Sequence, residues 1–184
     1  MIPHAVRMIS CSELRHVAPA VIDPILQVLR RTGIGILGTL RADGSPRVSP
    51  IEVSIQDGDL FVGMMPGSRK ALDVTRDPRV CLLTPVADRE DLGGEGKLFG
   101  RLLALSGDDA EARLAAAAAD AGFDPELVRG SPSFELRVDG AAWQRVDGDA
   151  WTTLSWRLGG PVRLRHRVGA TGMPVEVPLD QPAA

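Results

Sequence analysis

The sequence predicts a mainly β fold, an antiparallel β-barrel with peripheral helices, from three observations. First, short apolar segments alternate with turn residues along much of the 184-residue chain. Second, the turns between the first three apolar segments are too short for the crossover connections that parallel strands require. Third, six or seven short strands interrupted by a few helices are typical of a closed or partly closed barrel.

The N-terminal part of the chain predicts one helix and a three-stranded meander. Apolar residues recur at helical spacing from Pro19 to Arg31, and Gly33 follows as a stop signal. An Asp-Gly turn separates the next two apolar segments, and a second Asp-Gly turn precedes the third. We therefore expect antiparallel strands at residues 35–40, 47–55 and 60–64.

The rest of the chain predicts two further helices and several more strands. Ser68 is a good N-cap for a short helix that Pro78 ends, and residues 108–121 form an alanine-rich helix followed by Gly122. The polar segment 88–96 is expected to be a mobile loop. The remaining strands are expected at residues 79–84, 97–105, 134–138, 142–146 and 151–158.

We expect one domain over residues 1–160. Residues 161–184 are rich in Pro, Gly and Arg, and we expect a tail that is either disordered or packed on a partner subunit.

Composition excludes several functional classes. The net charge of −3 argues against a nucleic-acid surface, and two cysteines with three histidines argue against a metal site. The sequence shows no apolar stretch of transmembrane length and no signal peptide, so we expect a cytoplasmic protein that does not bind membranes.

The segment Gly67-Ser68-Arg69-Lys70 has the chemistry of a phosphate site. The first turn of a helix leaves backbone N–H groups without partners, and its dipole favours negative charge. A hydroxyl, a guanidinium and an ammonium stand at the same place. Arg47 opens the neighbouring strand, with Ser49 on the same face, and adds a cation. The alternative is an ordinary capped helix with solvated cations.

These residues also resemble a known family, the pyridoxamine 5′-phosphate oxidase-like flavin-binding split barrels. The resemblance lies in the hairpin 36–50, in Gly67-Ser68-Arg69-Lys70-Ala71 and in Arg76-Asp77-Pro78-Arg79-Val80, in that order. It covers residues 34–106 well and the remainder loosely. The resemblance implies an antiparallel split β-barrel.

The resemblance also implies a homodimer with FMN between the subunits. Arg47 and Lys70 would hold the phosphate, with Arg69 beside it. The strand that starts at Arg47 would run along the cofactor, backbone near Gly63 and Met64 would face the flavin ring, and Trp143 would contact it. Packing in the core explains Trp143 equally well. The predicted cofactor-binding residues are Arg47, Val48, Ser49, Pro50, Gly63, Met64, Ser68, Arg69, Lys70 and Trp143.

Two departures argue against authentic pyridoxamine phosphate oxidase. Glu52 stands where those oxidases carry a lysine for the substrate phosphate, and no Arg-x-His pair follows Trp143. We therefore expect an FMN-dependent oxidoreductase acting on another small molecule, with no catalytic residue that the sequence can identify. The alternatives are a reductase of the same fold that uses the deazaflavin coenzyme F-420, and a non-catalytic barrel that binds a cofactor or haem.

Overall fold

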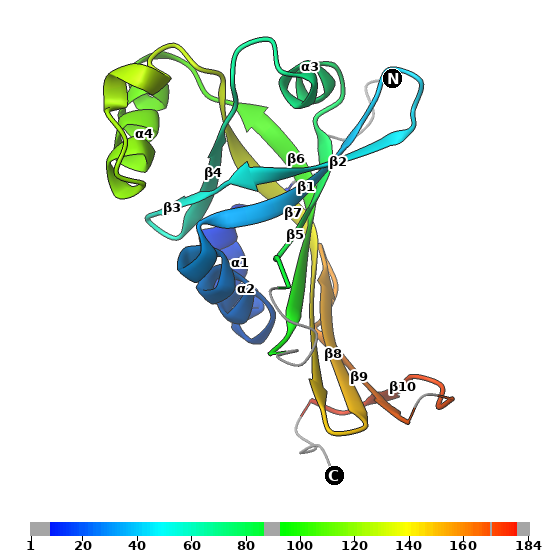
Figure 1. Cartoon of the computed structure of the whole chain (residues 1–184). Coiled ribbons are helices and arrows are strands. Elements are labelled where there is room, and N and C mark those ends of the chain that lie inside the picture. The colour runs from blue at the N-terminus through cyan, green and yellow to red at the C-terminus, as the bar shows by residue number, and fades with distance from the viewer. Residues whose placement is uncertain (1–7, 87–92, 170, 180–184) are drawn as a thin grey trace.

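The structure is a computed structural model that describes residues 8–86, 93–169 and 171–179. Within these ranges it contains ten strands and four α-helices (Figure 1). The strands are β1 (Ile34–Leu40), β2 (Pro46–Glu52), β3 (Ser54–Gln56), β4 (Asp59–Gly63), β5 (Arg79–Leu83), β6 (Glu95–Ala104), β7 (Ser133–Asp147), β8 (Ala150–Arg157), β9 (Arg163–Val168) and β10 (Val175–Val177). The helices are α1 (Cys11–Val17), α2 (Pro19–Thr32), α3 (Arg69–Arg76) and α4 (Gly107–Asp120), with a 3-10 turn at Pro125–Val128.

All strand pairs are antiparallel, and the sheet branches at β7. The main path runs β10-β9-β8-β7-β6-β5-β1-β2. The first residues of β7 also pair with β4, and its later residues pair with β8 instead. Figure 1 shows the result: a barrel around β1 to β7, and an arm of β8, β9 and β10 that extends away from it. The expected fold class, an antiparallel split barrel with peripheral helices, is confirmed.

The predicted meander differs from the observed pairing. The expected strand 47–55 is interrupted at Val53, so that β2 pairs with β1 whereas β3 pairs with β4. Two successive hairpins replace one three-stranded meander, because the break at Val53 lets the chain leave one part of the sheet for another. The second hairpin then places β4 against β7.

The strands expected separately at 134–138 and 142–146 are one strand, β7. Its pairing with β6 shifts register between Phe99 and Gly100, where the residues opposite are Gly140 and Val138. Asp139 is the extra residue of this β-bulge, and its carbonyl oxygen accepts a hydrogen bond from the Leu158 N–H at 2.9 Å. A bulge bends a strand without ending it, so the two expected segments form one continuous strand.

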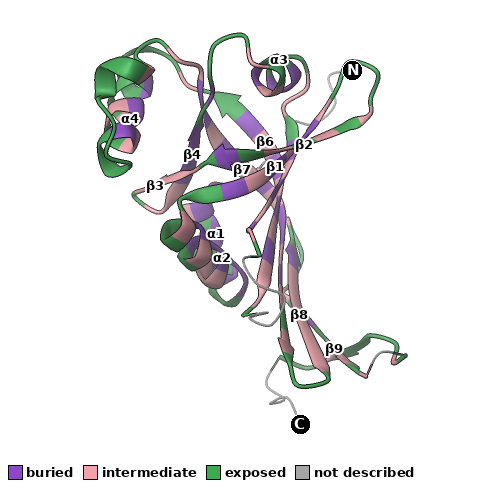
Figure 2. Ribbon diagram, in the orientation of Figure 1, coloured by how far each residue is buried: buried purple, intermediate pink, exposed green. Residues whose placement is uncertain are grey.

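The core lies between the barrel strands and the two N-terminal helices. The apolar face of α2, from Val21 to Leu29, is buried together with Leu37, Leu98 and Leu136 of the sheet (Figure 2). Helix α2 is confirmed, with Gly33 in the left-handed conformation at its C-cap. Helix α1 was not predicted, although Ser10 and Glu13 form a complete capping box at its start.

Much of the C-terminal segment forms strands, whereas one of the two expectations for it was a disordered tail. Residues Arg163–Val168 pair with β8 as strand β9, and Val175–Val177 pair with β9 as strand β10. The expectation of a disordered tail from residue 161 is therefore wrong for these residues. Packing of this segment on a partner stays a prediction.

Of the expected loop 88–96, residues 88–92 lie outside the described part of the chain, and Glu95 and Gly96 belong to β6. In the part of the chain that the structure describes, no helix is both long and apolar enough to cross a membrane.

Candidate functional site

Helix α3 and the turn between β1 and β2 form the two walls of the candidate site. In the turn, Arg41 N–H donates to the Ser45 carbonyl oxygen at 2.8 Å, and Gly44 takes a positive φ of 82°. At the start of α3, Gly67 has a φ of 70° and the Ser68 hydroxyl accepts from the Ala71 N–H at 3.4 Å. Glycine at both positions allows left-handed backbone that other residues rarely adopt.

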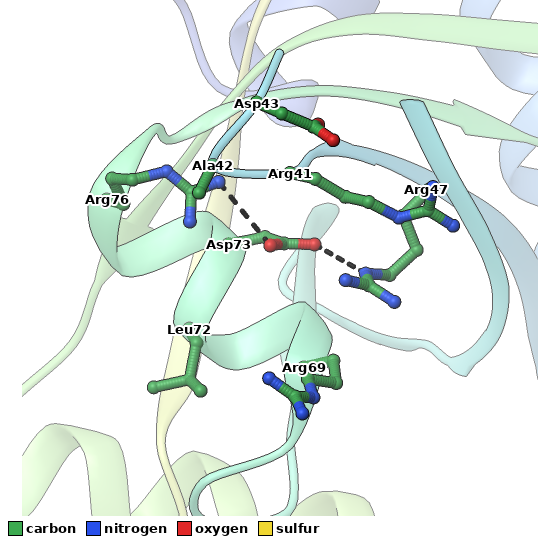
Figure 3. Close-up of a pocket in the computed structure, with 8 residues that line it drawn as sticks. All are labelled: Arg41, Ala42, Asp43, Arg47, Arg69, Leu72, Asp73 and Arg76. Atoms are coloured by element: carbon green, nitrogen blue, oxygen red, sulfur yellow. Dashed lines mark hydrogen bonds and ion pairs between the residues drawn. The ribbon is translucent and has the colours of Figure 1, made fainter. Parts of the chain in front are cut away.

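A pocket of about 330 Å³ lies between these walls and is open to solvent. Four arginines and two aspartates line it together with Ala42 and Leu72 (Figure 3). The charged residues are Arg41, Asp43, Arg47, Arg69, Asp73 and Arg76. Residues 69, 72, 73 and 76 share one face of α3, since residues three and four apart lie together on a helix. The excess of guanidinium groups makes this pocket a candidate anion site.

Asp73 is buried at the centre of the charged group and organises it. Its Oδ2 accepts hydrogen bonds from Arg47 Nε at 2.6 Å and from Thr39 Oγ1 at 3.0 Å. Its Oδ1 lies 3.4 Å from Nη2 of Arg76, which also donates to the Leu40 carbonyl oxygen. Thr39 lies directly opposite Arg47 in the β1–β2 register. Asp73 engages Arg47 through Nε, and the two terminal nitrogens of that guanidinium have no hydrogen-bond partner in the part of the chain that the structure describes, so they can accept an anion as ligand.

These contacts change the pKa of Asp73. Burial by itself raises the pKa of the carboxyl group, but the hydrogen bonds from Arg47 and Thr39 and the nearby guanidinium charges outweigh it. The pKa of Asp73 therefore lies below its ordinary value, and the carboxylate stays ionised at neutral pH.

The lowered pKa predicts a pH-dependent contribution of Asp73 to stability. The contribution is complete above the pKa of the unfolded chain, about 3.9, and is lost as pH falls through the lower folded value. At pH 7 we expect Asp73→Asn to lower the free energy of unfolding by roughly 1–3 kcal/mol. Urea unfolding from pH 7 to pH 2.5 should show this difference shrinking below about pH 4. A difference that stays constant over this range would refute the assignment.

The residues predicted to bind the phosphate do not all line the pocket. Arg47 and Arg69 both line the pocket, whereas Lys70 does not and donates from Nζ to the Pro50 carbonyl oxygen at 2.8 Å. Partial burial lowers the pKa of Lys70, and the charge of Glu52 opposes this. Ser49 is on the more buried face of β2 with Arg47, and its Oγ is buried with no hydrogen-bond partner among the described residues.

The residues predicted to lie along the flavin ring are dispersed. Val48 and Pro50 lie on the exposed face of β2. Gly63 ends β4 opposite Ser133, and the Met64 side chain is buried while its N–H donates to the Pro132 carbonyl oxygen at 2.9 Å. Trp143 is buried in β7 within the hydrophobic core, where it is paired with Leu154. None of these five residues lines the pocket.

Four charged residues of the pocket were missed by the sequence reasoning: Arg41, Asp43, Asp73 and Arg76. The signal for the last two was the spacing of Arg69, Asp73 and Arg76 at i, i+4 and i+7 in a short helix, which places them on one face. Arg41 had no local signal, because its approach to α3 depends on how the hairpin folds over the helix.

Fold and pocket together define a split β-barrel with an arginine-lined pocket between a hairpin and a short helix. The model of the family described as pyridoxamine 5′-phosphate oxidase matches residues 22–160, and the chain belongs to this family. No curated protein matches the chain.

Solved structures resemble the chain in fold at low sequence identity. A haem-binding protein from Mycobacterium smegmatis has a TM-score of 0.55 and 21% identity over 83% of this chain, which spans 60% of that protein's length. A Clostridium acetobutylicum protein of the pyridoxinephosphate oxidase family, related to general stress protein 26 of B. subtilis, has a TM-score of 0.58, with 11% identity over 74% of this chain and 93% of its own. HutZ, the haem storage protein from Vibrio cholerae, has a TM-score of 0.50, with 15% identity over 64% of this chain and 89% of its own.

Proposed function

We propose that this chain is an FMN-binding oxidoreductase that holds the cofactor phosphate between α3 and β2. The supporting observation is the pocket that Arg47 of β2 and Arg69 at the start of α3 both line. Guanidinium groups bind phosphate oxygens bidentately, and the N-terminus of α3 adds its backbone N–H groups and dipole. Lys70 stands next to Arg69, and Ser68 opens the helix.

The residues present fit a phosphate better than a neutral ligand. The donors at the helix start are cations or a hydroxyl, and Ser49 contributes a buried hydroxyl without a partner among the described residues. A buried polar atom without a partner is unfavourable, so a ligand atom that meets Ser49 would be stabilising. Val48, Pro50, Gly63, Met64 and Trp143 stay proposed contacts of the flavin ring.

A bound flavin would supply hydride transfer to or from a small conjugated molecule. The protein's own contribution would be to bind and orient the cofactor: Asp73 fixes Arg47, and Arg47 and Arg69 fix the phosphate. Glu52 lies exposed on β2, on the face that carries Val48 and Pro50. Its carboxylate disfavours a phosphorylated substrate near it, so we propose a substrate other than pyridoxamine phosphate.

We further propose a homodimer with the cofactor at the subunit interface. The outward face of the β1–β2 pair supports this, because Ile34 and Val48 are 43% and 69% exposed and Ile36 is half-buried beside them. Exposed apolar side chains gathered on one sheet face are typical of an interaction surface.

Two other functions remain candidates. Coenzyme F-420 would place its phosphate on the same arginines. Haem binding is the other candidate, because two structural neighbours are a haem-binding and a haem storage protein. His166 also supports it, since its buried Nε2 has no partner among the described residues. Its Nδ1 lies 3.2 Å from the Thr152 hydroxyl.

The absorbance spectrum of freshly purified protein separates these candidates. We expect flavin bands, or colourless protein that gains them with FMN at a Kd in the micromolar range or below, and light scattering of that sample should give the mass of a dimer. A Soret band would favour haem, and a deazaflavin band would favour F-420. A protein that takes up neither FMN nor F-420 would overturn the proposed function.

A further inference from the structure

The two ends of the proposed cofactor site differ in charge. At the phosphate end, four arginines and two aspartates line the pocket. At the other end, β2 finishes with Glu52, and α4 lies beside the last residue of β4. Residues 107–128, which include α4 and the 3-10 turn after it, contain six aspartates and glutamates but one arginine. The phosphate end is therefore positive and the opposite end negative.

Glu52 and α4 both approach Gly63. In the β3–β4 hairpin, Ser54 lies opposite Phe61. Two further residues along this register place Glu52 level with Gly63, and β2 and β4 are in contact. A Cβ at Gly63 would lie 3.0 Å from Leu114 Cδ2, so α4 borders the same point. Backbone near Gly63 is a proposed contact of the flavin ring, and negative charge therefore gathers beside the proposed position of the ring.

The carboxylate of Glu52 is exposed and has no close cation. It lies on the outward face of β2 and forms no ion pair at 4 Å or less in the described part of the chain. The charge of Lys70 interacts with that of Glu52 over a longer distance. However, Lys70 Nζ donates to the Pro50 carbonyl oxygen at 2.8 Å. The carboxylate oxygens of Glu52 are thus available to a cation from outside.

Apolar side chains flank this carboxylate on the outward face of the sheet. Ile34 lies directly opposite Glu52 in the β1–β2 register and is exposed. Val48 and Pro50 precede Glu52 on the same exposed face of β2. A carboxylate within an apolar surface is matched by a cation with an apolar body, because the charge gains a partner while the body buries apolar area.

We propose that the substrate is a cationic conjugated molecule, an amine or an amidine with a planar apolar body, whose charge pairs with Glu52. This rests on the proposed function, which places the flavin ring along Val48 and Pro50. Alternate residues of a strand are about 7 Å apart, so Glu52 lies about that far beyond Pro50. A molecule one ring in length can therefore stack on the flavin while its charged group reaches the carboxylate. The negative charge of α4 attracts cations to this end of the site and disfavours anions.

Three probes of similar shape and different charge test this inference on the FMN-loaded protein. Benzamidine is cationic, benzamide is neutral and benzoate is anionic, and the shift of the flavin absorbance bands during titration gives the Kd of each. We expect benzamidine to bind at least tenfold more tightly than benzoate, with benzamide between them. Benzoate binding as tightly as benzamidine would overturn the inference, whereas uptake of FMN in the same experiment would leave the proposed function intact.

Two variants of Glu52 test whether this residue sets the preference, with Glu176→Gln on β10 as the control. Glu52→Gln should reduce the preference for benzamidine over benzoate to less than threefold, and Glu52→Lys should reverse it. Glu176 is also an exposed carboxylate, but β10 and β2 stand at opposite ends of the main strand path, so its variant should keep the full preference. A full preference in Glu52→Gln would refute the role of Glu52.

Thermal unfolding gives a readout that needs no flavin and separates this inference from the proposed function. Benzamidine should raise the Tm of the protein without FMN more than benzoate does at equal ionic strength, and Glu52→Gln should remove that difference. If FMN does not bind but this difference is present, the cation site stands and the proposed function fails. In protein that takes up no FMN, equal Tm shifts by both probes would overturn the cation site as well.

Discussion

Arg47→Ala is expected to weaken FMN binding by more than tenfold. The change removes a charge-assisted contact to phosphate worth roughly 1.5–3 kcal/mol. Arg47 is the most firmly positioned cation of the pocket. Its Nε lies 2.6 Å from Asp73 Oδ2, and its side chain is only 24% exposed. Quenching of flavin fluorescence during titration gives the Kd directly.

The same substitution also affects stability, which has to be separated from affinity. Asp73 loses one of its partners and keeps Thr39 and Arg76, so the free energy of unfolding should fall by roughly 1–3 kcal/mol. Arg69→Ala avoids this effect, since Arg69 has no ion pair among the described residues. It should weaken FMN binding by a similar factor with no loss of stability. Unchanged FMN affinity in both variants would remove the phosphate site from this pocket.

The sequence predicts the candidate site in part, because its elements are local. The Asp-Gly turn, the Ser68 cap and the helix that follows all depend on residues close together in the chain, and the structure contains each of them. Arg47 was expected near the loop at Gly67, and it shares the pocket with Arg69. The role of Asp73 was not predictable, since it depends on α3 packing over Thr39 of β1.

The errors in the fold have a common physical origin in long-range pairing. The break at Val53 and the bulge at Asp139 depend on which strand lies opposite. The local sequence pattern does not contain that information. Strand β9 was missed for the same reason. Its arginine-rich sequence looks like a solvated tail, yet Leu164 is buried, and β8 and β10 pair on either side of it. Helix α1 is different, because its capping box was present in the sequence and could have been used.

Among Gly→Ala substitutions in the strands of the sheet, Gly100→Ala is expected to lower stability the most. A Cβ at Gly100 would lie 1.9 Å from the backbone carbonyl oxygen of Arg137, at the register shift where β7 passes from the barrel into the arm. A backbone oxygen cannot rotate away as a side chain can, so β6 and β7 must separate at the bulge. We expect a loss of about 3 kcal/mol in the free energy of unfolding.

Gly38→Ala is the matched control, because Gly38 lies in β1 of the same sheet and its added Cβ would be 3.4 Å from the Cys81 carbonyl oxygen. That contact is close to an ordinary van der Waals distance, and the change should stay within about 1 kcal/mol. Thermal unfolding should therefore place Gly100→Ala roughly 6–12 °C below the unmodified protein and Gly38→Ala close to it. Similar Tm values for the two variants would mean that the bulge yields easily and does not fix the direction of the arm.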